Sequence, residues 1–191
     1  MPTVRPYARN DWEAVLALCL LAFAPACESL EGRKGVALDW KEAMGRYLRS
    51  LTRPSRKRSF LVAEMNESVV GFVHWDVDPE TRSGSIGVSA VHPGRQGQGI
   101  GSLLYRRALD AMREQRLECA TAETSTDASH AAARRAYEKA GFVARPAVHY
   151  VVNLGDSSCE CFGETMTVRD EARRPPRRRR GPDRTGADRG R

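Results

Sequence analysis

The chain has 191 residues, 41% of them hydrophobic, and a formal net charge of +7. That is enough apolar material for one domain with a core, and no apolar run reaches the ~20 residues of a membrane span. The charge is uneven, because residues 168–191 hold ten arginines and four acidic residues, leaving a net charge of only +1 for residues 1–167. A basic domain surface built for nucleic acid is therefore not indicated.

The five cysteines stand at positions 19, 27, 119, 159 and 161. An odd number at irregular spacings is a poor disulfide framework, so we expect a reducing, cytoplasmic location. Cys159 and Cys161 form a C-x-C pair without a second Cys or His pair at metal-ligand spacing. We therefore expect no metal site.

The N-terminal part begins with a predicted short strand at residues 3–6 and continues into an apolar run at 15–26. Asn10, as a helix cap with Glu13 three residues later, predicts a helix there rather than a secretory segment, which stays the alternative. The buried face of this helix would carry Val15, Leu18, Cys19 and Ala22.

A second amphipathic helix is predicted from Leu38 to about Leu51, followed by a basic, proline-containing loop. The periodicity then changes to that of strands. Three are predicted, at residues 60–65, 69–75 and 85–91, and Asn66-Glu67-Ser68 marks a hairpin between the first two.

A glycine-rich turn follows the third of these strands and leads into a helix whose apolar face begins at Ile100. The next predicted elements are a strand at 119–124 and a helix capped by Asp127 or Ser129 and ended by Gly141. Two closing strands, at 142–143 and 148–152, complete the pattern. Strand, glycine turn and helix in this order favour a bound phosphate, because glycines admit a bulky anion and helix N-termini attract it.

The turn reads Val91-His92-Pro93-Gly94-Arg95-Gln96-Gly97-Gln98-Gly99-Ile100-Gly101-Ser102-Leu103-Leu104. It resembles the acyl-CoA-binding motif of the GNAT superfamily of N-acyltransferases, and Tyr137-Glu138-Lys139-Ala140-Gly141-Phe142 resembles a second motif of that family at the expected interval. The resemblance covers about residues 3–154.

The resemblance implies a single α/β (α+β) domain over residues 1–154, with a mixed central sheet of six to seven strands and about four helices. Residues 155–191 lose periodicity and become rich in arginine, proline and glycine. They cannot bury enough apolar surface to offset their ordering entropy, so we expect a disordered basic tail.

The resemblance also implies the binding site for acetyl-CoA. Backbone N–H groups of the turn would hold the pyrophosphate, the strand before the turn would pair with the pantetheine arm, and His130 stands where the family often has an asparagine that contacts the cofactor. The expected binding residues are Ala90, Val91, Gln96, Gly97, Gln98, Gly99, Ile100, Gly101, Ser102 and His130.

For catalysis, Tyr137 matches the family's usual general acid, since a phenol can return a proton to the departing thiolate. Many members carry a glutamate on the strand before the turn, but this chain has Ser85, Gly87 and Ser89 there. We take Glu123 as the first candidate for the general base, followed by His74 and Asp76.

The predicted function is transfer of acetyl from acetyl-CoA to a primary amine of a small molecule or peptide, without a covalent intermediate. Two alternatives stay open. One is a non-catalytic module that binds acyl-CoA, and the other is nucleic-acid binding through the arginine-rich tail. The sequence does not decide between a monomer and a homodimer.

Overall fold

A computed structural model describes residues 1–28, 39–126 and 128–148. The predicted tail, the domain boundary at 154, most of the last closing strand and the proposed cap Asp127 lie outside these ranges. Those expectations stay predictions.

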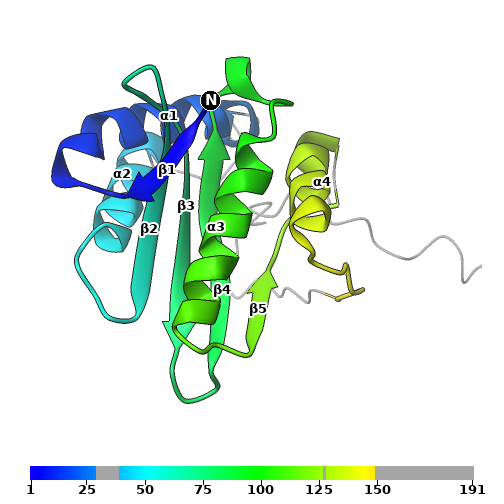
Figure 1. Ribbon diagram of the computed structural model, residues 1–191. Coiled ribbons are helices and arrows are strands. Elements are labelled where there is room, and N and C mark those ends of the chain that lie inside the picture. Colours follow the sequence, from blue (N-terminus) through cyan, green and yellow to red (C-terminus); the bar gives the residue numbers. More distant parts are fainter. Residues whose placement is uncertain (29–38, 127, 149–191) are drawn as a thin grey trace, which may run out of the picture.

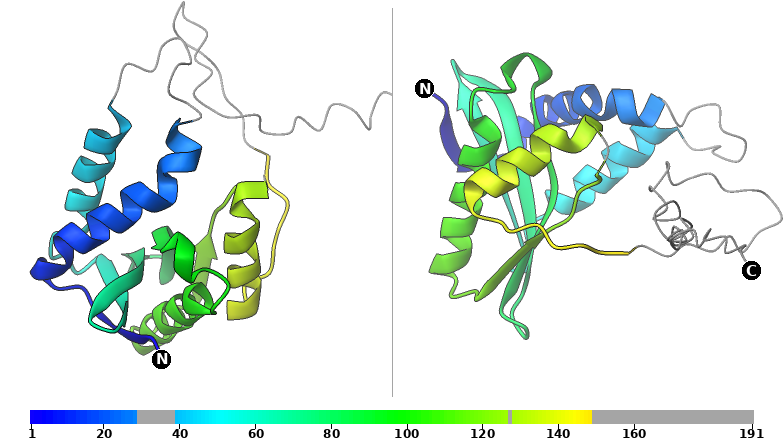
Figure 2. Two further views of the ribbon diagram at one scale, coloured as in Figure 1. Left: turned by 90° about the horizontal axis from the view of Figure 1, so that it is seen from above. Right: turned by 90° about the vertical axis from the view of Figure 1, so that its right-hand side faces the viewer.

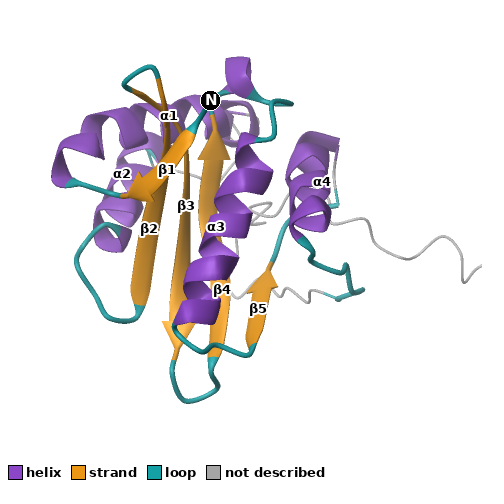
Figure 3. Ribbon diagram, viewed as in Figure 1, coloured by secondary structure: helices purple, strands orange, loops and turns teal. Residues whose placement is uncertain are grey.

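The described part is organised around a five-stranded mixed sheet in the order β1-β2-β3-β4-β5 (Figures 1 and 3). The first four strands pair antiparallel and β5 joins β4 in parallel. The strands are β1 (Thr3–Pro6), β2 (Arg58–Met65), β3 (Ser68–Asp78), β4 (Ser83–Val91) and β5 (Cys119–Ala122).

In the described part of the chain, four α-helices flank the sheet, and three short 3-10 turns stand at residues 9–11, 93–95 and 128–130. The helices are α1 (Trp12–Glu28), α2 (Trp40–Leu51), α3 (Ile100–Glu114) and α4 (Ala131–Ala140). Figure 2 shows α1 and α2 on one face of the sheet and α3 on the other, with α4 beside α3. Among the described helices, none combines the length and the apolar character needed to cross a membrane.

Each face of the sheet has its own apolar cluster. On the α3 face, the largest buried member is Trp75, packed with residues of α3 such as Leu104 and Met112. On the α1/α2 face, Phe72 is fully buried and stacks on Phe60 with ring centroids 5.3 Å apart. The alternation of side chains along the strands thus supplies both layers of the core.

The N-terminus of α1 differs from the sequence prediction. Asn10 lies within the 3-10 turn at Arg9–Asp11 and α1 begins at Trp12. Asp11, which is buried, accepts a hydrogen bond from the Ala8 N–H at 2.7 Å and pairs with the Arg5 guanidinium at 2.7 Å. Asp11 thus takes the third position of a capping box on the 3-10 turn, whose N-cap is Ala8, and the expected asparagine cap is not formed.

The end of the described chain also differs. Gly141, with φ 102°, ends α4 as predicted, but Phe142–Val143 forms no strand. Phe142 instead packs edge-on against Tyr137, with ring centroids 5.4 Å apart, and its N–H donates to the Tyr137 carbonyl. These residues close the C-terminus of α4 rather than extend the sheet.

Candidate active site

The site begins where β4 and β5 part. These strands pair only from Ser83↔Cys119 to Ile86↔Ala122, so residues 87–91 of β4 have no strand partner on that side within the described ranges. On its other side, β4 continues to pair with β3 as far as Val91. The sheet therefore opens along the second half of β4.

The hydrogen-bond register shows which backbone groups face the opening. The His92 N–H donates to the Val70 carbonyl on β3. Because antiparallel bonding alternates, Ala90 also bonds toward β3, while the N–H and C=O groups of Ser89 and Val91 point away from it. This free edge can accept one more extended chain.

The glycine turn lies at the end of the free edge. Gly97 and Gly99 have φ of 78° and 81°, and Gly99 is the N-cap of α3. The Leu103 N–H bonds to the Gly99 carbonyl, so the preceding helical N–H groups, from Ile100 to Ser102, lack intrahelical partners. Together with the positive end of the helix dipole they form a binding site for an anion.

A cavity of about 490 Å³ joins the free edge to the turn and is walled by α1, α3 and α4. Nine of the ten residues predicted to bind the cofactor line it, namely Ala90, Val91, Gln96, Gly97, Gly99, Ile100, Gly101, Ser102 and His130. Gln98 is exposed and is not part of the lining.

Tyr137, the predicted acid, is buried and does not line the cavity. It stacks on Tyr105 of α3, with ring centroids 4.4 Å apart and planes 19° apart. Tyr105 does line the cavity, and its hydroxyl lies 2.9 Å from that of Ser89 on β4. Burial raises the pKa of Tyr105 above its usual range, and Tyr137 adds to the rise while the Ser89 hydrogen bond opposes it.

Glu123, the predicted base, lies one residue beyond the end of β5 and is exposed, so it is not on the expected strand. Ala120 and Ala122 pack toward the α3 face. Continued alternation would direct Glu123 toward the opposite face. Glu123 is not among the cavity-lining residues.

Three cationic residues of the cavity wall were missed by the sequence reasoning. Arg95 belongs to the 3-10 turn beside the glycines, and Arg135 and Lys139 belong to α4. The i, i+4 spacing of the last two was a usable signal, because it places them on one helix face with Ala132 and Ala136, which also line the cavity. The cavity therefore combines an apolar middle with a positive end.

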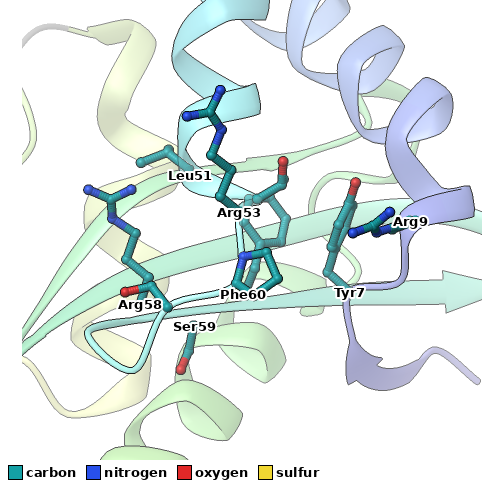
Figure 4. Close-up of a pocket in the computed structure, with 10 residues that line it drawn as sticks. Tyr7, Arg9, Leu51, Arg53, Arg58, Ser59 and Phe60 are labelled. Carbon is teal, nitrogen blue, oxygen red and sulfur yellow. The ribbon is translucent and has the colours of Figure 1, made fainter.

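A second pocket of about 340 Å³ lies at the β1/β2 end of the sheet and shares no lining residue with the cavity (Figure 4). Arg9, Arg53 and Arg58 border it, above a floor formed by Leu51 and Phe60. Arg58 is engaged, donating to Asp76 at 3.1 Å and to the Ser50 carbonyl at 2.9 Å. Among the described residues, no group of three or more His, Cys, Asp or Glu side chains could hold a metal ion.

Comparison with known sequences yields two findings. The sequence profile described as "Acetyltransferase (GNAT) family" matches residues 20–142. A mycothiol acetyltransferase of Tsukamurella paurometabola is 33% identical over 150 residues, which cover 73% of this chain and 48% of the relative. The chain thus spans about half the length of this curated relative.

Solved structures share the fold. The ribosomal-protein-S18-alanine N-acetyltransferase from Escherichia coli superposes with a TM-score of 0.55 at 20% identity, covering 74% of this chain and 77% of that one. AAC(6')-Iy, in complex with the bisubstrate analogue CoA-S-monomethyl-acetylneamine, gives a TM-score of 0.57 at 12% identity, covering 80% and 98%. At these identities the likeness concerns the architecture.

Proposed function

Because the chain belongs to the acetyltransferase (GNAT) family, we propose that it transfers the acetyl group of acetyl-CoA directly to a primary amine, without a covalent enzyme intermediate. The observation that carries the proposal is the cavity that follows the free edge of β4 and ends at the glycine turn. Its shape suits an extended arm with a charged phosphate group at one end.

Acetyl-CoA would lie with its pyrophosphate against the N–H groups of Gln96 to Ser102. The positive charges of Arg95, Arg135 and Lys139 would attract the phosphates. The pantetheine amides would pair with the free backbone groups of Ser89 and Val91, which extends the sheet by one strand-like segment.

This arrangement leaves the thioester near the point where β4 and β5 diverge. From Val91 back to Gly87, four residues of strand span about 13 Å. A neutral amine held there would attack the thioester carbonyl, and binding both reactants side by side removes much of the entropic barrier.

Tyr137 is the proposed proton donor to the departing thiolate, with Tyr105 as the neighbouring phenol that borders the cavity. Tyr137→Phe should lower kcat by about 10²-fold or more and leave CoA affinity nearly unchanged. Tyr105→Phe is the matched control, for which we expect a smaller loss. Equal turnover by wild type and Tyr137→Phe would remove Tyr137 from this role.

The acceptor is proposed as a class only. The names of the relatives suggest three probes: neamine, the deacetylated form of mycothiol and a peptide with N-terminal alanine. The assay is release of the CoA thiol from acetyl-CoA with each amine, followed by mass spectrometry of the acetylated product.

Arg135→Glu and Lys139→Glu should weaken CoA binding and increase KM for acetyl-CoA.

A second candidate is a module that binds acyl-CoA without transferring the acyl group. It is favoured by one observation, the absence of a carboxylate among Ser85, Gly87 and Ser89 of β4. CoA binding without thiol release across the amine panel would support this candidate. Whether the chain has a general base that can take the proton of the amine therefore decides between the two functions.

A further inference from the structure

His74 of β3 is an unusual buried residue. Its side chain is 1% exposed, and neither imidazole nitrogen has a hydrogen-bond partner among the described residues. A buried polar group without a hydrogen-bond partner costs folding stability, because it has lost its bonds to water. Such a cost in a packed sheet calls for an explanation.

The imidazole lies against a bulge in β4. Between the pairs Val73↔Ser89 and Trp75↔Ile86, the single residue His74 faces two residues, Gly87 and Val88. A Cβ atom at Gly87 would come within 2.7 Å of the His74 Nδ1. The glycine therefore makes room for the ring.

The bulge coincides with the start of the opening in the sheet. Gly87 is the first residue of β4 beyond its last pair with β5, and it is exposed. Nδ1 of His74 thus faces the backbone of an exposed residue that carries no side chain. On the other side of the ring, Nε2 lies 3.7 Å from Oδ1 of Asp76, whose side chain is 53% exposed.

Nδ1 is buried, and neither His74 nor Gly87 is among the cavity-lining residues, so the substrate cannot touch the imidazole directly. We propose that His74 is the general base of the acetyl transfer, accepting the proton of the acceptor ammonium at Nδ1 through one water beside Gly87 and passing it from Nε2 toward Asp76 and solvent. This inference rests on the proposed function. Asp76 is held for this role by Arg58, whose Nε donates to the same Oδ1 at 3.1 Å.

The proton balance is complete. The ammonium gives one proton to His74, and the resulting neutral amine attacks the carbonyl carbon of the thioester. As the tetrahedral intermediate collapses, the C–S bond breaks and the thiolate takes a proton from the phenol. The second proton of the nitrogen passes to solvent, and solvent returns one proton to the phenolate. The net products are the amide, the CoA thiol and one proton released to solvent.

The electrostatic setting suits a base. Burial lowers the pKa of His74 below its usual 6.5, Asp76 opposes this change and Arg58 adds to it. The facing residues of β4 are Ile86, Gly87 and Val88, which are uncharged. In the apolar cluster on the α1/α2 face the titratable groups are Cys19 and Tyr7. Burial raises the pKa of Cys19 to about 12, so it stays a neutral thiol. The imidazole is therefore neutral and able to accept a proton near pH 7.

The first experiment compares His74→Gln with wild type, using thiol release with an acceptor from the amine panel. We expect kcat/KM to fall by about 100-fold or more, with CoA affinity within twofold of wild type. Asp76→Asn should shift the acidic limb of the pH–rate profile to lower pH, because Asp76 raises the pKa of His74. A merely structural role of the pair would not move that limb.

A second set of variants tests the proposal even if a single replacement at His74 prevents folding. Gly87→Ala should displace the imidazole and lower turnover, whereas Gly45→Ala, whose Cβ would meet only Leu16 at 3.8 Å, should not. The double variant His74→Ala with Gly87→Glu puts a carboxylate into the vacated space. It should regain at least tenfold in activity over His74→Ala, because a carboxylate can accept the same proton.

The outcomes separate the two hypotheses. Turnover of His74→Gln equal to wild type, or an unmoved acidic limb in Asp76→Asn, would overturn the assignment of His74 and leave acetyl transfer intact. If wild type binds CoA but releases no thiol with any amine of the panel, both the proposed function and the role of His74 are refuted.

Discussion

Gly99 offers the sharpest test of the glycine turn. Its φ of 81° lies in the left-handed region, and a Cβ there would meet nothing within 4 Å. Replacement by alanine therefore adds backbone strain without a steric clash, and the expected cost is about 1–2 kcal/mol. For a domain of this size, that corresponds to a decrease in Tm of about 2–8 °C.

Gly101 is the matched control, because it lies in the same turn but has helical backbone geometry. Its Cβ would lie 3.5 Å from Cβ of Ala136 and 3.8 Å from Cγ2 of Val91, both ordinary contacts. Gly101→Ala should be neutral or stabilising by up to about 1 kcal/mol, since alanine favours the helix. Thermal and urea unfolding followed by circular dichroism measure both variants. Equal stability of Gly99→Ala and Gly101→Ala would contradict the described turn.

Three further substitutions test the ion pair of β1 and the two apolar clusters. Asp11→Asn should lower the free energy of unfolding at pH 7 by about 1.5–3 kcal/mol. Because Arg5 lowers the pKa of Asp11 in the folded state, this stability is fully present above the usual value of 3.8 and is lost as pH falls through the lowered pKa, so the difference between wild type and variant in urea unfolding should shrink as pH falls below 3.8. Phe72→Ala, at a fully buried position, should cost about 3–5 kcal/mol in urea unfolding, and a cost below 1 kcal/mol would contradict its packing. Tyr105→Phe removes the hydrogen bond to Ser89 and should lower the free energy of unfolding, measured in the same way, by about 1 kcal/mol. The double variant that also carries Ser89→Ala should be as stable as wild type, because neither hydroxyl is then left unpaired.

The glycine turn could be predicted because its signals are local. A strand, three closely spaced glycines and an amphipathic helix follow one another within twenty residues, and no distant contact is needed to place them. The same holds for the end of α4, where Gly141 adopts a positive φ. Both features depend on backbone conformations that few residues other than glycine adopt.

The wall of the cavity could not be predicted in the same way. Ser89 and Tyr105 are 16 residues apart, and their contact depends on how α3 is rotated relative to β4 after the turn. The burial of Tyr137 behind Tyr105 depends on that rotation and on the approach of α4. Sequence periodicity indicates which face of a helix is apolar, but not which residue of a neighbouring element it meets.

The position of the base shows the same limit. Glu123 is expected as the base because the predicted strand at 119–124 includes it, but β5 ends at Ala122, where its pairing with β4 stops. His74, the next candidate after Glu123, lies in an apolar strand. A histidine in such a strand is most simply interpreted as a core residue. Only the register of β3 with β4 shows that the histidine faces a bulge and a glycine at the opening.

The opening in the sheet also has a mechanical consequence. β5 and the helix that follows it are tied to the rest of the sheet by four residue pairs and by the packing of α4 on α3. A CoA molecule lying along β4 and touching α4 would contact both the main sheet and the unit of β5 and α4. The cosubstrate would therefore stabilise the position of this unit as well as react. We expect amide hydrogen exchange in α4 to slow on CoA binding much more than exchange in β2, which is paired on both sides in either state.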